Sequence, residues 1–384
     1  MKILIVSDIP TSPVNAGNRK LIAAYTSLFK RWGHEVHFLY VYRHNLRKRY
    51  RMEAKNSIPG TRKEWGNLFH QYDYSLQENL RANMNIIKSK LFHDDYRKVD
   101  EIYPAGLSKE ILRLHGLHHF DALLVNYFYL SKALEAIPIK RKALFTHDSF
   151  SLHQKGKGYK AAYYLKEEEE TKALRRAPYI FAMQDVEAEY FHKLAPNAKI
   201  LINYSHYDFH GQPVIGNHNL LYLSGASAFN LQGLSWFIEK VLPKIRLEFP
   251  NARLCIGGGI CKMLSDFNKP DYIEVVGYVD DPYDFFMKGD VAINPCQVGT
   301  GLKIKTFEAI SYDKVTMVHP HSLIGVYKKG EVPVFASSRA EDWVTYLRKA
   351  WHEPEFISSI KTRNRQYIND MDRFVEGEYK TWLF

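Results

Sequence analysis

The sequence is poor in cysteine and contains no long apolar run. Its three cysteines, Cys255, Cys261 and Cys296, are widely spaced and match neither a disulfide framework nor a zinc-binding pattern, which indicates a reducing cytoplasm. No segment approaches the roughly 18 to 20 apolar residues that a membrane-spanning helix needs. The opening apolar run, residues 1–6, is too short for a signal-peptide core and predicts a buried strand. We therefore expect a cytoplasmic protein that contacts a membrane at most peripherally, from the inner face.

Two catalytic motifs are also missing. The chain has no Gly-X-Ser-X-Gly nucleophile elbow and no Walker-type phosphate loop, which excludes the enzymes that depend on them. Acidic residues are outnumbered by basic ones, and the formal net charge is +11. Such a charge attracts anions without selecting among nucleic acid, anionic lipid and the phosphates of a nucleotide-sugar.

What is present is an alternation of short apolar runs and longer amphipathic stretches, which predicts parallel sheets covered by helices. A first series predicts strands at residues 2–7, 35–40, 122–125, 141–146, 179–182 and 199–202, with helices near 18–32, 158–176 and 185–194. A second series predicts strands at residues 220–223, 253–256, 273–276, 291–294, 315–318 and 332–335, with helices at 233–248, 302–311 and 340–351. The fold class is therefore α/β with two Rossmann-like halves.

The boundary between the halves lies where His, Gly, Pro and Asn accumulate, at residues 206–218, which read as a linker. We expect an N-terminal Rossmann-like domain over residues 1–205 and a C-terminal one over residues 219–354. A helical tail follows at residues 355–384, and its return to the N-terminal domain stays open. Ligands bind beyond the carboxyl ends of parallel strands, so the two sheets are expected to face each other across a cleft.

A basic segment interrupts the first series. Residues 43–63 hold eight Lys or Arg side chains and one acid, Glu53, with tyrosines among them. We interpret residues 43–95 as an insertion. Basic residues interleaved with aromatics suit an anionic membrane surface or a polyanionic acceptor, and a solvated surface segment is an equal alternative.

The most informative stretch is GTGLKIKTFEAI at residues 299–310, which follows a predicted strand and opens a helix. Backbone N–H groups at a helix start, approached through glycines, form an anion site, and two lysines add charge. A carboxylate two turns into the helix can accept hydrogen bonds from a ribose diol. The candidate donor-binding residues here are Gly299, Thr300, Gly301, Leu302, Lys303, Lys305 and Glu308.

This stretch resembles the donor-site signature of the retaining GT-B glycosyltransferases of family 4, also called glycosyl transferases group 1. The segment FNLQGLSWF at residues 229–237 is similar to the start of that family's nucleotide domain. The segment VGYVDD at residues 276–281 is similar to the family's turn beside the nucleotide base, so Tyr278 and Val279 join the candidate donor-binding residues. Two features depart from the pattern. Thr300 stands where many members carry a glutamate, and residues 225–232 lack the basic residues that many members place there.

The N-terminal half resembles the same family more weakly. PVNAGNR at residues 13–19 is similar to the loop that faces the donor phosphates, with Gly17, Asn18 and Arg19, and we expect Arg19 to help to hold phosphate. His147 and Asp148 follow a strand in a loop similar to the acceptor-side loop. We predict that they orient or deprotonate the acceptor hydroxyl or contact the transferring sugar.

Further polar residues receive simpler interpretations. The acidic run at residues 167–170 reads as a solvated helix face, and the histidine pair at residues 118–119 shows no metal-ligand spacing. His319 and His321 are candidates for the border of the donor site, because they follow the strand after Glu308.

The resemblance implies a GT-B glycosyltransferase of the hexosyltransferase kind (EC 2.4). Such an enzyme moves a sugar from a nucleotide-sugar to a glycan or lipid-linked acceptor, with retention and without a cofactor or metal, in cell-surface polysaccharide or glycoconjugate synthesis. The donor base stays open, and no nucleic acid partner is expected. Four alternatives remain: a nucleic-acid or polyanion-binding protein on the same scaffold, a nucleotide-sugar epimerase, a phosphorylase and a catalytically silent subunit.

Overall fold

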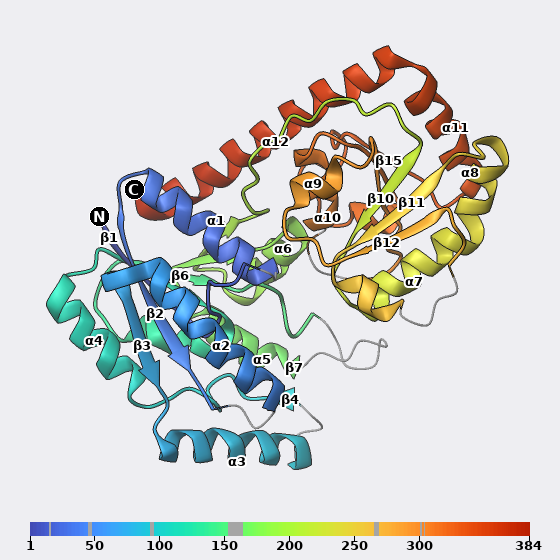
Figure 1. Cartoon of the computed structure of the whole chain (residues 1–384). Helices are drawn as coiled ribbons and strands as arrows, with labels where there is room; N and C mark the ends of the chain where they lie inside the picture. The colour runs from blue at the N-terminus through green and yellow to red at the C-terminus, as the bar shows by residue number, and fades with distance from the viewer. Residues whose placement is uncertain are drawn as a thin grey trace. The chain divides into compact units, whose positions relative to one another are not determined.

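The computed structural model describes residues 1–14, 17–44, 48–92, 96–152, 164–264, 269–299, 302 and 304–384, with the backbone alone for residues 48–51. The chain divides into two compact units (Figure 1). Unit 1 comprises Met1–His206 together with Val375–Phe384, and unit 2 comprises Tyr207–Phe374. No helix among the described residues combines the length and the apolar character that crossing a bilayer requires.

Unit 1 is built around a seven-stranded sheet in the order β3-β2-β1-β5-β6-β8-β9, and every strand pair in it is parallel. β4 and β7 form a separate pair. The elements are β1 Lys2–Ser7, α1 Gly17–Arg31, β2 Glu35–Tyr42, α2 Lys48–Trp65, β3 Phe69–Asp73, α3 Leu76–Phe92, β4 Tyr96–Arg97, α4 Leu107–His118, β5 Ala122–Asn126, β6 Arg141–Phe145, β7 Tyr164–Leu165, α5 Glu167–Leu174, β8 Tyr179–Ala182, α6 Asp185–Leu194 and β9 Lys199–Ile202.

Unit 2 has a six-stranded sheet in the order β12-β11-β10-β13-β14-β15, again wholly parallel. The prediction of two α/β halves with parallel sheets is confirmed. The elements are β10 Asn219–Leu223, α7 Ala228–Trp236, α8 Leu242–Glu248, β11 Arg253–Gly257, β12 Ile273–Gly277, α9 Pro282–Phe286, β13 Val291–Asn294, α10 Ile304–Ser311, β14 Val315–Val318, β15 Val334–Ala336, α11 Ala340–His352 and α12 Pro354–Leu383.

Burial on both faces explains the apolar strands. In β1, Ile3, Leu4, Ile5 and Val6 have no exposed surface, as expected for a central parallel strand covered by helices on each side. In unit 2, Leu220 and Tyr222 of β10 belong to one core cluster and Leu221 to another, so alternate residues serve opposite faces.

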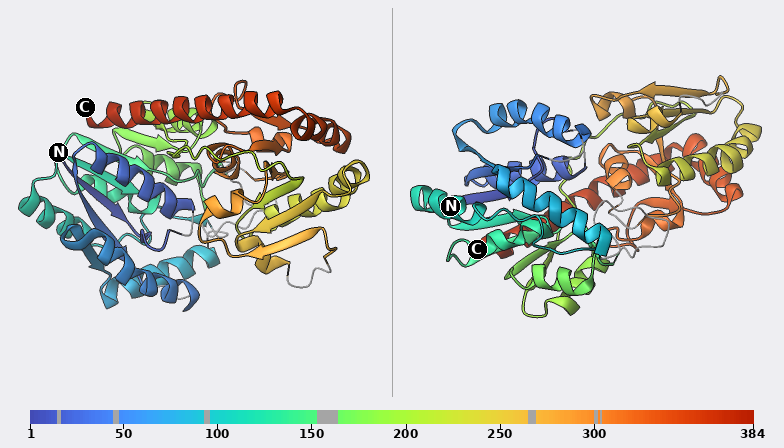
Figure 2. Two further views of the ribbon diagram at one scale, coloured as in Figure 1. Left: turned by 45° about the horizontal axis from the view of Figure 1, so that its top comes forward. Right: turned by 90° about the horizontal axis from the view of Figure 1, so that it is seen from below.

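Helix α12 begins in unit 2 and ends in unit 1. Its last turns lie beside α1, and the end of the chain is close to that helix in both figures (Figures 1 and 2). The Phe29 ring of α1 meets Tyr379 at 5.1 Å and Trp382 at 5.9 Å between ring centroids. Tyr379, Trp382 and Leu383 are buried, so the final residues form part of the core of unit 1.

The segment at residues 43–95 is not an insertion into the sheet. It contains α2, β3 and α3, and β3 pairs in parallel with β2, from Phe38 opposite Phe69 to Tyr42 opposite Asp73. β3 is thus the edge strand of the main sheet. The sequence FHQYD carries a single strongly apolar residue, so the hydrophobic pattern of an edge strand is too weak to predict it.

Candidate functional site

Each sheet has one place where the strand order reverses, and ligands bind beyond the carboxyl ends of the strands there. In unit 2 the chain moves outward from β10 through β11 to β12, and then from β13 through β14 to β15 on the other side. The reversal therefore lies between β10 and β13. In unit 1 the same reasoning places it between β1 and β5.

In unit 2 the loops after β10 and β13 meet through Asn230 and Lys305. Ser227 caps α7, because its hydroxyl accepts a hydrogen bond from the Asn230 backbone N–H at 3.1 Å. The Asn230 side chain donates to the carbonyl of Gly225 at 2.9 Å, and its Oδ1 accepts from Lys305 Nζ at 2.6 Å. An ammonium group from α10 is thus held at the start of α7, in the loop that has no basic residue of its own.

The loop after β11 folds closely onto the loop after β10. Gly258 has φ +89°, and a Cβ atom there would lie 2.6 Å from the carbonyl oxygen of Ser224. That oxygen accepts a hydrogen bond from the Ile260 N–H at 3.0 Å. A side chain at position 258 would break this contact and strain the backbone, so the loop requires glycine.

Gly299 is held by a histidine that follows the next strand. His321 Nε2 donates to the carbonyl of Gly299 at 2.7 Å, and the His321 N–H donates to His319 Nδ1 at 3.2 Å. Burial, followed by the nearby His321, lowers the pKa of His319. The two histidines therefore support the backbone of the predicted phosphate loop.

The other predicted donor residues have different positions. Thr300, Gly301 and Lys303 lie outside the described residues, and Leu302 and Glu308 are half-buried. After the larger effect of burial, the Glu308 charge contributes to raising the pKa of Tyr312 to about 12. Tyr278 and Val279 follow β12, the edge strand; the Tyr278 ring is exposed, whereas Val279 packs against a core cluster with Leu221.

In unit 1, His147 is hydrogen-bonded at the ends of two neighbouring strands. Its Nε2 lies 2.7 Å from Oδ1 of Asn126, the last residue of β5, which also accepts from the Tyr25 hydroxyl at 3.1 Å. Because Asn126 Nδ2 donates to the carbonyl of Val6, its Oδ1 is the acceptor and His147 carries its proton on Nε2. Burial lowers the pKa of His147 to about 3. The imidazole is neutral at physiological pH, which makes it a hydrogen-bonding group and a poor general base.

Backbone strain concentrates at this point. His147 has φ 62° and Tyr127 has φ 69°, a region that costs non-glycine residues on the order of 1–3 kcal/mol. Their rings stack, with centroids 4.3 Å apart, and the Tyr127 hydroxyl accepts a hydrogen bond from Asn18 Nδ2 at 3.0 Å. Strained residues that persist at strand ends are typical of functional sites.

Asp148 is paired with a buried glutamate. Burial and the Asp148 charge raise the pKa of Glu187, whose side chain also accepts from the Met183 N–H at 3.1 Å. The two carboxyl groups therefore hold one proton between them near neutral pH. Asp148 also accepts a hydrogen bond from the Ser149 N–H at 3.0 Å, so it is positioned by both neighbours.

The acidic run at residues 167–170 is not wholly a solvated helix face. Glu170 has no exposed surface, and its carboxylate accepts hydrogen bonds from the N–H groups of Phe150 and Ser151 at 3.1 and 2.8 Å. The interpretation was wrong for this residue, because its partners come from a loop about twenty positions earlier. Glu170 fixes the loop that carries His147 and Asp148.

Asp8, which the sequence analysis missed, lies at the end of β1. The Tyr129 hydroxyl donates to both of its carboxylate oxygens at 3.0 Å, and burial raises its pKa to about 6. Together with Asn126 and Tyr127 it lines the reversal point between β1 and β5. The sequence does contain a signal for this residue, because the polar Ser7 and Asp8 come directly after the apolar run of β1.

The start of α1 contributes Asn18 but not Arg19. Gly17 is the exposed first residue of the helix. Arg19 is buried, and its guanidinium donates to the Pro13 carbonyl at 3.1 Å and pairs with Glu53 at 3.1 Å. We expected Arg19 to help to hold phosphate; instead it ties the loop after β1 to α2.

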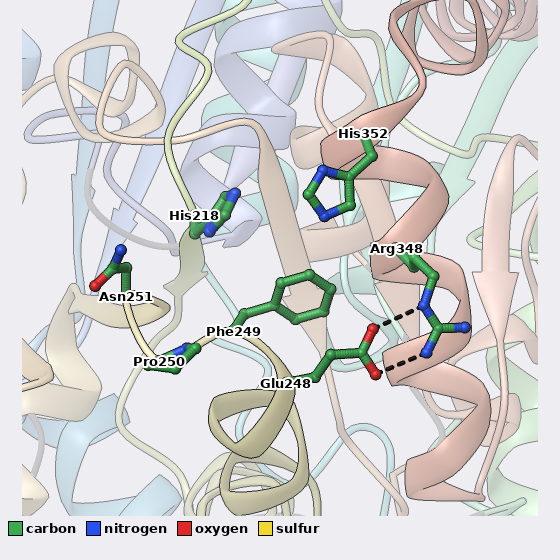
Figure 3. A pocket seen from close by; sticks show the side chains of 7 residues that line it. All are labelled: His218, Glu248, Phe249, Pro250, Asn251, Arg348 and His352. Atoms are coloured by element: carbon green, nitrogen blue, oxygen red, sulfur yellow. Dashed lines mark hydrogen bonds and ion pairs between the residues drawn. The ribbon is translucent and has the colours of Figure 1, made fainter.

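A pocket of about 370 Å³ lies elsewhere in unit 2, and Figure 3 shows its lining. It is formed around His218, Phe249 and His352, next to the beginning of β10 rather than its end. Glu248 and Arg348 line it and neutralise each other through two hydrogen bonds of 2.7 Å. The pocket therefore lies at the amino ends of the strands, opposite the carboxyl ends where the strand order reverses. Its Arg348 is paired with Glu248 and does not provide a free positive charge for a phosphate.

Comparisons with known proteins find a family resemblance in unit 2. Residues 217–352 match the family model described as "Glycosyl transferases group 1". No curated protein sequence matches the chain.

Solved structures of similar fold cover nearly the whole chain. A variant of S. aureus TarM, in complex with fondaparinux, alpha-GlcNAc-glycerol and UDP, has a TM-score of 0.63 and 10% identity over 100% of this chain and 99% of its own. The pneumococcal O-GlcNAc transferase GtfA, in complex with UDP and GlcNAc, has a TM-score of 0.62 and 11% identity. The match covers 100% of this chain and 98% of its own. Anabaena HepE, in complex with UDP and glucose, has a TM-score of 0.59 and 11% identity, and the match covers 99% of both chains. The chain has the GT-B fold of these glycosyltransferases.

Proposed function

We propose that the protein is a glycosyltransferase that binds a nucleotide-sugar in unit 2 and transfers the sugar to a glycan or lipid-linked saccharide acceptor. The observation that carries the proposal is the position of Lys305. Its ammonium group donates a hydrogen bond to Asn230 Oδ1 at the point between β10 and β13 where the strand order reverses. Both residues are inside the segment that matches the family model. Retention of configuration, independence of metal and a role in cell-surface polysaccharide or glycoconjugate synthesis belong to the same proposal.

The donor phosphates would be stabilised by Lys305 and by the N–H groups of the first turn of α10 that follow Ile304, whose own N–H donates to the Leu302 carbonyl. Breaking the bond from the sugar to the diphosphate leaves negative charge on the leaving group, and positioned cations stabilise such charge strongly. Glu308, on the same helix, would accept hydrogen bonds from the ribose. Uracil is the base we propose, since three of the compared structures hold UDP.

The role proposed for unit 1 follows from the neutral state of His147. Its Nδ1 is an acceptor, because Nε2 holds the proton, so it would orient a hydroxyl group of the sugar or the acceptor. The Asp148–Glu187 pair, which holds one proton, is the better candidate for accepting the proton of the acceptor hydroxyl.

The test of the donor site is a thermal-shift series with UDP, GDP, ADP, dTDP and CMP. A nucleotide at about 100 times its dissociation constant stabilises the folded state by roughly 2.7 kcal/mol. We expect UDP to raise Tm in the wild type, and Lys305→Ala and Glu308→Ala to abolish the shift. Lys349→Ala, an exposed lysine of α11, is the matched control and should keep the shift. A wild type that no nucleotide stabilises would contradict the donor site.

A membrane surface is the second partner that we propose, and the observation behind it is α3. The polarity of this helix is the reverse of the usual one, because small or polar residues are buried and large apolar residues are exposed. The buried residues are Asn79, Ala82 and Ser89, and the exposed ones are Leu76, Leu80, Met84, Ile87 and Leu91. The exposed residues recur every three or four positions and form one apolar face. Figure 1 places the helix at the margin of unit 1.

Polar contacts hold the buried side of α3. Asn79 Oδ1 accepts from the His44 N–H at 3.0 Å, and the Ser89 hydroxyl donates to Glu101 at 2.5 Å. Arg81, Lys88 and Lys90 are exposed around the apolar face. An apolar face bordered by cations suits the surface of an anionic bilayer. The membrane contact that we propose is therefore centred on α3, which follows the basic segment at residues 43–63 along the chain.

Vesicle flotation tests this contact. The wild type should float with vesicles containing phosphatidylglycerol and much less with phosphatidylcholine alone. The double variant Leu80→Asp/Ile87→Asp should stay in the soluble fraction, whereas Leu247→Asp should bind as the wild type does, since Leu247 is a lone exposed leucine of α8. Equal flotation of both variants would contradict the assignment, and salt-sensitive binding of oligonucleotides in place of vesicles would favour a nucleic acid partner.

A further inference from the structure

Three histidines from separate elements of unit 1 converge at the amino edge of its sheet. They are His37 in β2, His70 in β3 and His118 at the end of α4. One ring nitrogen of each lies within 4.8 Å of those of the other two. His70 is opposite Leu39 in the ladder, so His70, Leu39 and His37 face the same side of the sheet. Leu39 packs there in one core cluster with Ile111 and Leu114 of α4.

The distances suit ligands of one ion. His37 Nδ1 and His70 Nε2 are 2.9 Å apart. Two imidazole nitrogens that bind the same tetrahedral Zn²⁺, each about 2.05 Å from it, lie about 3.4 Å apart, so a small ring movement admits the ion. The rings of His37 and His118 are 4.4 Å apart between centroids.

Glu35 completes the arrangement around His37. Its Oε1 lies 2.8 Å from His37 Nε2, so that nitrogen carries the proton and Nδ1 presents its lone pair to the other histidines. Metal-binding histidines commonly donate their second N–H to a carboxylate in this way, which orients the ring and increases its basicity. Lys2 Nζ lies 3.7 Å from Glu35 Oε1, so the carboxylate also pairs with an ammonium group.

Phe120 covers the cluster, with its ring 5.0 Å from His37 and 5.7 Å from His118 between centroids, and limits access of water.

We propose that His37, His70 and His118 bind a divalent transition-metal ion of the Zn²⁺ class, with Glu35 as the carboxylate that orients His37. Three imidazoles select zinc, cobalt or nickel over magnesium and calcium, which prefer oxygen ligands. The ion joins the starts of β2 and β3 to the end of α4. This edge of the sheet is opposite the strand ends that carry Asp8 and Asn126, so the ion stabilises unit 1 and takes no part in sugar transfer.

The test uses the full-length, tag-free protein after treatment with a chelator. Titration with Zn²⁺ followed by calorimetry should show one ion bound per chain, with a rise in Tm, and Co²⁺ should give the visible absorption of a tetrahedral site. His70→Gln and His118→Gln should remove binding. Glu35→Ala should weaken it about 10- to 100-fold. His192→Gln, an exposed histidine of α6, is the control and should bind as the wild type does.

The three substituted residues were chosen so that a loss of Zn²⁺ binding can be separated from a loss of folding. His70, His118 and Glu35 are not fully buried, so their variants are expected to fold, and circular dichroism and the Tm without metal check this. Absence of Zn²⁺ binding by the folded wild type would overturn the proposal. Binding of equal strength by His70→Gln and His118→Gln would overturn it as well, because the ion would then sit elsewhere.

Discussion

Two stacked rings mark the ends of β5 and β6, and both belong to residues with positive φ. Tyr127 and His147 are held in this conformation by Asn18 and Asn126, which bond the tyrosine hydroxyl and the imidazole. Sequence reasoning located His147 because it follows an apolar strand. It could not give the state of the ring, because burial and Asn126, a residue of another strand, determine the pKa and the tautomer.

At the residue scale, the ring of His147 is expected to stay neutral with its proton on Nε2 between pH 5 and 8, since burial lowers its pKa to about 3. Nitrogen-15 NMR of the imidazole groups measures this directly, with exposed histidines of the same chain as the internal reference. His147→Ala should lower kcat/KM about 10- to 150-fold through the lost hydrogen bond. A protonation midpoint near pH 6.5 at His147 would show instead that the residue can act as a base.

At the scale of elements, every strand of the two main sheets except β3 was predictable, because these strands are short apolar runs in the sequence. Helix α3 was not, since its apolar residues face outward, and β3 was not, since an edge strand needs few apolar residues. Lys305 shows a third limit. The loop after β10 lacks a basic residue in sequence, yet the fold brings one to Asn230 from α10. The histidine cluster has the same origin, because its members lie far apart along the chain.

The contact between the loops after β10 and β11 gives a prediction about unit 2. Gly258→Ala should lower the free energy of unfolding by at least about 1–3 kcal/mol, because the methyl group meets the Ser224 carbonyl and φ is +89°. Gly330→Ala is the matched control, since its Cβ meets nothing within 4 Å, and it should be near neutral. Urea unfolding followed by fluorescence measures both. Equal stability of the two variants would show that the loop can rearrange.

At the scale of the whole molecule, α12 contributes residues to both units. The last ten residues of the chain belong to unit 1, although everything between Tyr207 and Phe374 belongs to unit 2. The tail was predictable as a helix from its length and polarity, and its return to the first unit stayed open. The rings that hold it, Tyr379 and Trp382, find their partners on α1 and β8, which no local pattern reveals.

Trp382→Ala should lower the stability of unit 1 by about 3–5 kcal/mol, because the ring is buried against Phe29 and Phe181. Phe384→Ala is the control, since Phe384 is exposed, and it should change little. Hydrogen exchange resolved by segment measures the effect in each unit separately. Faster exchange confined to residues 207–374 would contradict the division of the chain.

The end of α12 also determines the order in which the protein can fold during synthesis. Unit 1 is translated first, but its core lacks Tyr379 and Trp382 until residues 375–384 have been synthesised. At about 5 to 20 residues per second, the ribosome needs roughly 10 to 35 s to pass from residue 206 to residue 384. Protease resistance of stalled nascent chains ending at residues 206, 374 and 384 measures when each unit closes. Unit 1 is thus the first unit to be translated, yet it can complete its core only after all of unit 2 has been synthesised.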